Sequence, residues 1–388
     1  MFIYLACIRT FVKGRSMRGI SKYAIVGIII AVVAIAGVGA WYYTTYTATP
    51  KKLTIYFFDP APGNPWWDLV PHGIEMAIKD VQSQKGVTIE YKRFDATTLD
   101  QQISQLQNAI SLRPNVAIVG PISDAVQDIL KQLRQAGTIV ILVDRDVPDQ
   151  TARDLYLGTN NRYAARFVAE NFLKSLQERG VNPPYNVIIF KGLPGIPTSY
   201  LRYQGFMDAL KPLVDQGKVK ILAEVEVDPD NFQECYSKAQ TIVASYGAQA
   251  TVWFATNNLQ AMAIVKALQD AGYKPGQDKY ICGFDAQPSD WLNMIKQGVV
   301  SMSVTQTPHL MGYWGVWAGY AIWSKQVNLP PKAYVNTPIY SVLPCNATVV
   351  ANKIDYLTVG YNELSTLLNQ LTPSNPGIQA PSYYAEPC

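Results

Sequence analysis

From Leu53 to Gln306 the chain alternates short apolar runs with amphipathic segments, and this alternation constrains the fold more than any other feature. Apolar runs that are rich in β-branched and aromatic residues and bounded by turn residues predict buried strands. The amphipathic segments predict helices, several of which end at a glycine, as at Gly272 and Gly298. Strands that alternate with helices indicate βαβ units and parallel sheets covered on both faces.

The predicted elements fall into two sets, which together hold more strands than one compact sheet usually does. The first set has strands at 53–58, 87–94, 116–120 and 139–144 and helices at 66–84, 99–112 and 123–136. The second set begins near Tyr156, with strands at 186–191, 219–227, 251–255, 280–285 and 301–306 and helices at 162–179, 198–213, 231–245, 258–271 and 288–297. We therefore predict two α/β lobes with a ligand cleft between them.

The turn after the first predicted strand presents two tryptophans. Asn64 is suited to cap the next helix and Pro65 to occupy its first position, so Trp66 and Trp67 are expected on its opening turn. Such a turn lies at the carboxyl edge of a parallel sheet, where open α/β folds bind ligands, and the two indoles form a candidate stacking surface. The alternative is that one or both indoles are ordinary core aromatics.

Polar residues follow four of the predicted strands: Asp144 with Arg145, Asn257, Asp285 and Gln306. A single polar residue at a strand end is usually a turn or cap residue, whereas four sites at one edge, beside two indoles, favour a binding site. Planar Asp, Asn, Gln and Arg side chains can each bind two hydroxyls, and indoles can cover the apolar faces of a sugar ring. This set of residues, without catalytic groups, predicts capture of a neutral sugar.

Seven motifs in a fixed order carry a resemblance to a known family: NPWW, VDRD, TSYLRYQGF, DPDNF, FATNN, GFD and TQTP. Over residues 53–343 the chain resembles the ribose-type branch of the periplasmic sugar-binding proteins, which are substrate receptors of ABC importers. The resemblance implies a monosaccharide or related polyol as ligand, an ABC transporter permease as partner, a monomer and no cofactor. The ligand-binding residues that it implies are Asn64, Trp66, Trp67, Asp144, Arg145, Arg202, Phe232, Asn257, Asp285 and Gln306.

The resemblance also implies the chain path of a type I periplasmic binding protein, in which two Rossmann-like lobes are joined by a three-segment hinge. The crossings are expected near Asn160, Thr307 and Val335. The first lobe then comprises 52–159 with 307–334, and the second comprises 160–306 with 335–348. Closure of the lobes about this hinge would bury the ligand.

Two features depart from the family pattern. Family members often carry phenylalanines at the positions of Trp66 and Trp67, so the larger indoles leave hexoses, other pentoses and inositols open beside ribose. Residues 349–388 form a C-terminal extension, for which we expect a helix at 355–371 and a loose polar tail at 372–384.

Cys345 and Cys388 are candidate disulfide partners, and Asn346 begins a glycosylation sequon.

Residues 23–43 carry no charge and are about as long as a bilayer-spanning helix requires. Five basic residues and no acidic residue precede them, and aromatic residues end them, which is the pattern of an anchor whose N-terminus is inside. We predict a cytoplasmic segment 1–22, a transmembrane helix 23–43, a linker 44–52 and a body on the outer face of the cell membrane. The alternatives are a cleaved signal segment and a start at Met17.

The rest of the chain holds 28 basic and 29 acidic residues, so it lacks the excess of positive charge that is typical of nucleic-acid-binding proteins. Two histidines and cysteines without zinc spacing offer little for a metal site or a nucleophilic triad, and we expect no enzymatic activity. Two other functions are open. One is a membrane-tethered sugar-sensing ectodomain, and the other is an enzyme acting on the same sugar with Asp144 and Asp285 as a glycosidase pair.

Overall fold

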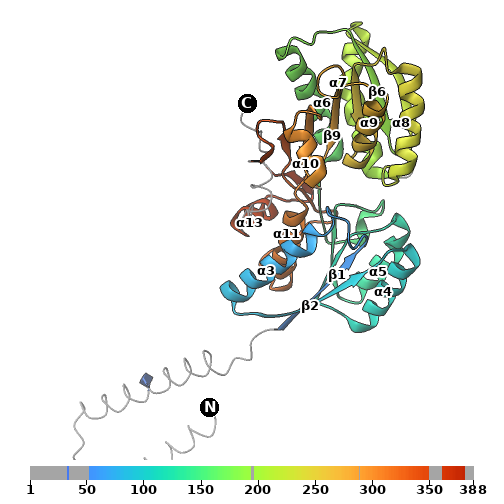
Figure 1. Cartoon of the computed structure of the whole chain (residues 1–388). Coiled ribbons are helices and arrows are strands. Elements are labelled where there is room, and N and C mark those ends of the chain that lie inside the picture. The colour runs from blue at the N-terminus through green and yellow to red at the C-terminus, as the bar shows by residue number, and fades with distance from the viewer. Residues whose placement is uncertain (1–32, 35–51, 194–195, 288, 349–360, 381–388) are drawn as a thin grey trace, which may run out of the picture. The chain divides into compact units, whose positions relative to one another are not determined.

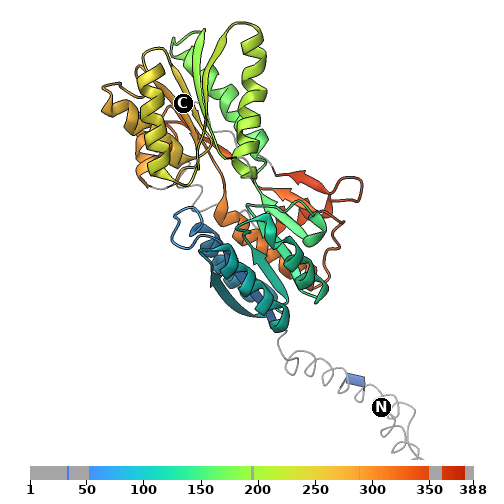
Figure 2. The ribbon, with the colours of Figure 1, turned by 90° about the vertical axis from the view of Figure 1, so that its right-hand side faces the viewer.

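The computed structural model describes residues 33–34, 52–193, 196–287, 289–348 and 361–380. Lys52–Cys388 forms one compact unit, in which the described residues build a seven-stranded and a six-stranded sheet. We call the layers built on these sheets lobe 1 and lobe 2 (Figure 1). In Figures 1 and 2 the orange α11 (Pro308–Trp323) lies among the blue and teal elements of lobe 1.

The sheet of lobe 1 has the order β13-β11-β5-β4-β3-β1-β2, and all neighbouring strands in it are parallel. The strands are β1 (Lys52–Asp59), β2 (Thr88–Asp95), β3 (Val116–Val119), β4 (Ile139–Val143), β5 (Leu155–Gly158), β11 (Tyr334–Asn336) and β13 (Gly377–Gln379). The other lobe 1 helices are α3 (Leu69–Lys85), α4 (Leu99–Leu112), α5 (Gln127–Gln135) and α13 (Tyr361–Asn369). Two short 3₁₀ helices are η1 (Asp124–Val126) and η2 (Gln150–Ala152).

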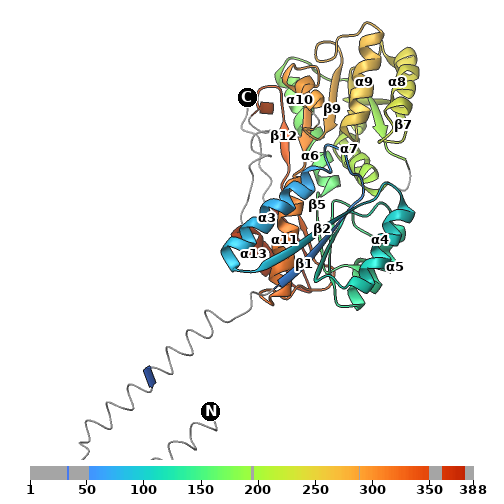
Figure 3. The ribbon, with the colours of Figure 1, turned by 60° about the horizontal axis from the view of Figure 1, so that its bottom comes forward.

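The apolar run of β1 is buried on both faces because its side chains alternate between two cores. Ile55 and Phe57 pack with α3, α11 and α13, whereas Tyr56 and Phe58 pack with α4 and α5. Figure 3 shows α4 and α5 on the opposite side of β1 from α3 and α11. A Cβ atom at Gly73 would lie 1.8 Å from the backbone oxygen of His309, so a glycine lets α3 and α11 cross closely.

The sheet of lobe 2 has the order β12-β10-β9-β8-β6-β7, and only the pair β10 and β12 is antiparallel. The strands are β6 (Tyr185–Lys191), β7 (Val219–Glu226), β8 (Val252–Ala255), β9 (Tyr280–Phe284), β10 (Met302–Thr305) and β12 (Tyr340–Val342). The helices α6 (Asn161–Glu178) and α7 (Pro197–Asp215) cover one face, and α8 (Phe232–Tyr246), α9 (Asn258–Asp270) and α10 (Ser289–Lys296) cover the other. The parallel α/β architecture of both lobes confirms the predicted fold class.

Up to β12 the chain passes between the sheets after β5, after β10 and after β11, and hydrogen bonds join these segments. Thr337 donates from its backbone N to Gly158 O at 2.7 Å, and Thr307 Oγ1 donates to Pro338 O at 3.1 Å. The last of these passages follows Asn336, slightly beyond the expected position near Val335, because Val335 still pairs with Leu157 in lobe 1.

Two expectations about the lobe 1 sheet are wrong. Tyr156, near which the second set of elements was expected to begin, belongs to β5 of the first sheet, between β4 and β11. The expected loose tail is incorrect for Gly377–Gln379, which form β13 and pair with β11. The tail residues pair because β11 leaves a free sheet edge, and local sequence patterns do not show which edges are free.

The C-terminal extension returns to lobe 1. Leu364 and Leu368 of α13 are buried in the core beneath α11, and Ala380 N donates to Asn336 O at 2.8 Å. Of the helix expected at 355–371, the structure shows α13, and residues 349–360 and 381–388 lie outside the described residues.

Among the described residues, no helix is both long enough and apolar enough to cross a membrane. Only Val33 and Ala34 of the predicted anchor 23–43 belong to those residues. The rest of that segment, the predicted cytoplasmic segment 1–22 and linker residues 44–51 lie outside them.

Candidate functional site

The two lobes present a carboxylate in the same way, each at the end of a parallel strand. Asp144 follows β4 and Asp285 follows β9, and both adopt left-handed backbone conformations, with φ of 63° and 74°. Asp144 N donates to Leu157 O and Asp285 N donates to Val304 O, so each turn is held by the neighbouring strand. An aspartate tolerates this conformation better than most residues, which explains the residue type at both strand ends.

Arg202 of α7 is held by several contacts within lobe 2. Its Nε donates to Asn161 Oδ1 and its Nη1 to Thr256 O, both at 2.8 Å. The guanidinium carbon is 4.3 Å from the centre of the Phe284 ring, and the side chain is almost fully buried. These contacts fix the guanidinium plane at the ends of the lobe 2 strands.

The charges of the site interact across the two lobes. Burial raises the pKa of Asp144, an effect opposed by Arg145 and then by Arg202 and reinforced by Asp285. Burial also raises the pKa of Asp285, against the lowering effect of Arg202 and of the hydrogen bond from Gln306. Burial lowers the pKa of Arg202, whereas Asp285 and Asp144 raise it. The charge of Arg202 therefore interacts electrostatically with carboxylates of both lobes.

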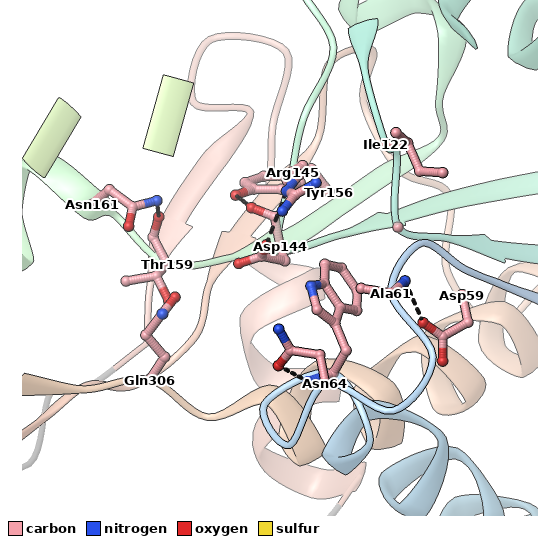
Figure 4. A network of polar contacts seen from close by, with 12 residues as sticks. Asp59, Ala61, Asn64, Ile122, Asp144, Arg145, Tyr156, Thr159, Asn161 and Gln306 are labelled. Atoms are coloured by element: carbon pink, nitrogen blue, oxygen red, sulfur yellow. Dashed lines mark hydrogen bonds and ion pairs between the residues drawn. The ribbon is translucent and has the colours of Figure 1, made fainter. Parts of the chain in front are cut away.

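Two polar atoms near this cluster are buried and have no hydrogen-bond partner among the described residues. Gln306 Nε2 donates to Asp285 Oδ1 at 2.8 Å, but Gln306 Oε1 is unpaired. Thr159 Oγ1 is also unpaired, while Thr159 O accepts from Asn161 Nδ2 at 3.2 Å (Figure 4). An unpaired buried polar group costs about 1–3 kcal/mol. Both atoms are therefore suited to a ligand that carries hydroxyl groups.

The turn at Asn64 differs from the expected helix start. Asn64 Oδ1 accepts from Trp66 N at 2.9 Å and from Trp67 N at 3.4 Å, but α3 begins only at Leu69. The two tryptophans therefore lie in the turn before the helix, and their placement on its opening turn is wrong. The side-chain oxygen of Asn64 orders this turn by accepting the backbone donors that a helix start leaves unpaired.

The two indoles differ in burial. Trp67 is only 3% exposed and belongs to the lobe 1 core, whereas Trp66 is partly buried and packs against that core. The rings meet edge to face at 5.1 Å, and the Arg145 guanidinium carbon lies 5.7 Å from the centre of the Trp67 ring. A Cβ atom at Gly120 would lie 2.6 Å from the Trp67 ring, so this indole needs a glycine beneath it.

Phe232 and Asn257 have evident structural partners in lobe 2. Phe232 opens α8 and its ring stacks on Tyr236 at 6.2 Å. Asn257 caps α9, since its Oδ1 accepts from Gln260 N at 2.9 Å, and its Nδ2 donates to Pro229 O at 2.8 Å. Their contact with a ligand, like that of the other implied site residues, stays a prediction.

Sequence reasoning missed the residues that hold the Asp144 loop. Tyr156 OH donates to Asp144 O at 2.8 Å (Figure 4), and Arg153 pairs with both carboxylate oxygens of Asp146 and donates to Ala333 O. Burial raises the pKa of Tyr156 well above its usual value, so its hydroxyl stays a donor. Recognition of β5 as a strand would have drawn attention to these residues and to Asn161 after it.

A cleft of about 620 Å³ lies between the lobes. Of the ligand-binding residues implied by the sequence, Asp144 and Arg145 line this cleft. The cleft is also lined by Tyr156, Asn161 and Asp230. The negative charge of Asp230 acts to raise the pKa of Arg202. The polar cluster and the cleft meet at Asp144.

Residues 55–326 match the periplasmic binding protein domain. This match covers more than half of the chain and contains all the residues of the polar cluster. The chain belongs to the periplasmic binding protein family. This assignment confirms the resemblance that was inferred from the seven motifs.

Relatives of this periplasmic binding protein include receptors named for sugars. The multiple sugar-binding periplasmic receptor ChvE of Rhizobium radiobacter is 23% identical over 65% of this chain and 72% of its own length. The galactofuranose-binding protein YtfQ of Escherichia coli is 23% identical over 55% of this chain and 66% of its own length. The D-xylose-binding periplasmic protein of Escherichia coli is 27% identical over 47% of this chain and 56% of its own length.

Solved structures show the same fold. A galactofuranose binding protein superposes with a TM-score of 0.64 at 20% identity, covering 79% of this chain and 99% of its own. A protein from Mycobacterium smegmatis in complex with β-D-fucofuranose superposes with a TM-score of 0.65 at 21% identity, covering 82% of this chain and 98% of its own. These likenesses establish that the two-lobe architecture is that of the periplasmic binding proteins.

Two predicted modification sites lie beyond the polar cluster of this periplasmic binding protein. Cys345 is disulfide-bonded, and its pairing with Cys388 stays a prediction because Cys388 lies outside the described residues. Asn346 is half-buried, and its Oδ1 accepts from Leu343 N at 2.8 Å. Glycosylation of Asn346 stays a prediction as well.

Proposed function

We propose that the protein is an extracytoplasmic solute-binding protein that captures a monosaccharide or related polyol between its lobes and delivers it to an ABC transporter permease. The observation that carries this proposal is the cluster of Asp144, Arg202 and Asp285, in which buried charges from both lobes interact. Carboxylate and guanidinium groups in this arrangement accept and donate to vicinal hydroxyls. Gln306 Oε1 provides a further group that is unpaired among the described residues.

Hinge closure is the proposed mechanism. In an open cleft, water hydrates the polar cluster, and in a closed cleft ligand hydroxyls replace that water. The hinge is formed by the segments around Gly158, Thr307 and Thr337, and the lobes turn about them as units. Lobe 1 then carries Asn64, Trp66, Trp67, Asp144 and Arg145, and lobe 2 carries Arg202, Phe232, Asn257, Asp285 and Gln306.

The proposal includes no enzymatic step. The charge of Arg202 interacts with both Asp144 and Asp285, and Asp285 also accepts a hydrogen bond from Gln306, so we assign the cluster to binding rather than to proton transfer to a leaving group. An assay for released reducing sugar checks this statement. We also propose that the charge-free segment 23–43 tethers the body to the outer face of the membrane.

A thermal-shift screen of the full-length protein in mild detergent tests the proposed function. A ligand that binds the native state raises the melting temperature by mass action. Pentoses, hexoses, inositols, disaccharides, nucleosides and amino acids are compared at one concentration. A rise with one or a few sugars is the expected result, and a rise only with nucleosides or amino acids would overturn the sugar assignment.

Sugar affinity is expected to fall as the pH is lowered from neutral. Burial raises the pKa of both Asp144 and Asp285, so they take up protons at a higher pH than exposed carboxyl groups. A neutral carboxyl group loses its charge-assisted bonds to hydroxyls. Titration calorimetry between about pH 7.5 and about pH 4.5 measures the change. Because the pKa values of Asp144 and Asp285 are higher in the folded protein than in the unfolded chain, the folded protein binds protons first as the pH falls. Protonation of these two groups therefore increases the free energy of unfolding and does not cause acid unfolding. Constant affinity over this range would contradict the prediction.

Tyr156→Phe is expected to weaken sugar binding about fivefold, because a buried hydrogen bond contributes about 1 kcal/mol and this bond holds the Asp144 turn. Tyr185→Phe is the matched control, since Tyr185 OH donates to Val181 O at the same 2.8 Å distance within lobe 2. Calorimetric titration of both variants provides the comparison. Equal affinities for the two variants would show that the Tyr156 hydroxyl does not position Asp144.

A further inference from the structure

The cleft between the lobes extends beyond the position of a single sugar ring. Its volume of about 620 Å³ lies in the range of about 300–1,000 Å³ that holds drug-sized ligands. Asp144 and Arg145 line it, whereas the implied contacts Asn64, Asp285 and Gln306 lie outside its lining. The cleft therefore continues from Asp144 away from these residues, toward the ends of β3 and β5 and the start of α7.

Apolar side chains of both lobes line this continuation. Ile122 follows β3 in lobe 1, and Ile196 and Leu201 lie at the start of α7 in lobe 2. Leu201 is 38% exposed, so its apolar side chain is accessible from the cleft. Apolar side chains from both lobes can contact the C–H faces of a sugar ring.

A buried hydroxyl also lines the same part of the cleft. Thr159 is 4% exposed, and its Oγ1 has no partner among the described residues. A ligand hydroxyl can pair with this atom. We call the part of the cleft lined by Ile122, Thr159, Ile196 and Leu201 the side cleft.

The charges of the cleft favour a neutral ligand. Among the described lining residues, both arginines are already paired: Arg145 Nε is 3.7 Å from Asp144 Oδ2, and Arg162 Nε is 2.6 Å from Asp208 Oδ2. Asp230 adds a negative charge to the wall. An anionic ligand such as a sugar phosphate would lack a free cation in this lining and would face acidic side chains.

We propose that the side cleft is a subsite for a second neutral sugar ring, so that the protein takes a disaccharide with one ring at Asp144 and the other between Ile122 and Leu201. This inference rests on the proposed function, because it assumes that the first ring binds at the polar cluster. The second ring would place its apolar face against the leucine and isoleucine side chains and a hydroxyl near Thr159 Oγ1.

Titration calorimetry of the full-length protein in mild detergent tests the subsite with matched pairs of sugars: D-xylose and xylobiose, D-galactose and galactobiose, and D-glucose and cellobiose. At least one disaccharide is expected to bind about tenfold more tightly than its monosaccharide, as one added ring contact of about 1.4 kcal/mol implies. Leu201→Asp is expected to abolish this advantage while the monosaccharide affinity stays unchanged. Leu112→Asp, at an exposed leucine that ends α4, is the matched control and is expected to keep the advantage.

The outcomes separate this inference from the proposed function. If monosaccharides bind and every disaccharide binds more weakly, the subsite is overturned and the proposed function stands. A disaccharide advantage that survives Leu201→Asp, in a variant whose circular dichroism spectrum is native, also overturns the subsite. Failure of every sugar to bind would contradict the proposed function and the subsite together.

Discussion

Asp144→Asn is expected to weaken sugar binding about 100-fold while the protein stays folded. The buried carboxylate faces the cleft and would accept hydroxyl groups through charge-assisted bonds, which contribute about 1.5–3 kcal/mol. An amide has the same shape but lacks the charge and one acceptor. Asparagine also tolerates the left-handed backbone at this position, where φ is 63°, so the turn is preserved.

The stability of Asp144→Asn separates a binding role from a structural one. Burial raises the pKa of Asp144, which means that its charged form is unfavourable in the free protein. The melting temperature of the variant is therefore expected to be unchanged or higher. Asp270→Asn is the control, because Asp270 is an exposed acid paired with Lys266 at 2.9 Å. An affinity within about threefold of the native protein would contradict the assignment of Asp144 to the site.

Arg202→Lys is expected to abolish measurable sugar binding and to lower the melting temperature by several degrees. A lysine cannot donate to Asn161 Oδ1 and Thr256 O at once, and it lacks the plane that lies over Phe284. The positive charge that acts on Asp144 and Asp285 would then no longer be held in a fixed position. Each buried oxygen that is left without its hydrogen bond costs about 1–3 kcal/mol, which accounts for the lower melting temperature.

Arg166→Lys provides the matched control for Arg202→Lys. Arg166 Nε bonds to Glu170 Oε1 at 2.8 Å, but this pair is exposed, and such pairs contribute about 0–1 kcal/mol. Both variants are titrated with the sugar found by thermal shift, at a temperature at which circular dichroism shows a folded protein. Retained affinity in Arg202→Lys would remove this arginine from the binding site.

Local patterns were sufficient for most elements of the two lobes. The predicted helix 99–112 coincides with α4, and the predicted strand 53–58 lies within β1. Such agreement is expected, because the spacing of apolar residues indicates whether one face of a helix or both faces of a strand are buried. Leu155–Gly158 was missed because it follows β4 without an α-helix between them, so the alternation of strands and helices does not predict it.

The sequence predicts those candidate site residues that directly follow a strand. Asp144 and Asp285 were found because parallel strands bring their carboxyl ends to one edge, and both occupy equivalent turns in their lobes. The neighbours of Arg202 were not found in this way. Asn161 lies at the start of α6 and Thr256 follows β8, and no local pattern places them beside α7.

The sequence by itself determined the α/β class, the two lobes and the polar strand ends, because periodicity and turn chemistry act over short stretches of chain. The tertiary structure decided that β13 completes the lobe 1 sheet, that Trp67 is buried in the core and that the charge of Arg202 interacts with carboxylates of both lobes. These features depend on which sheet edge is free and on which side chains meet across the cleft. Long-range pairing of this kind is settled only when all the elements pack together.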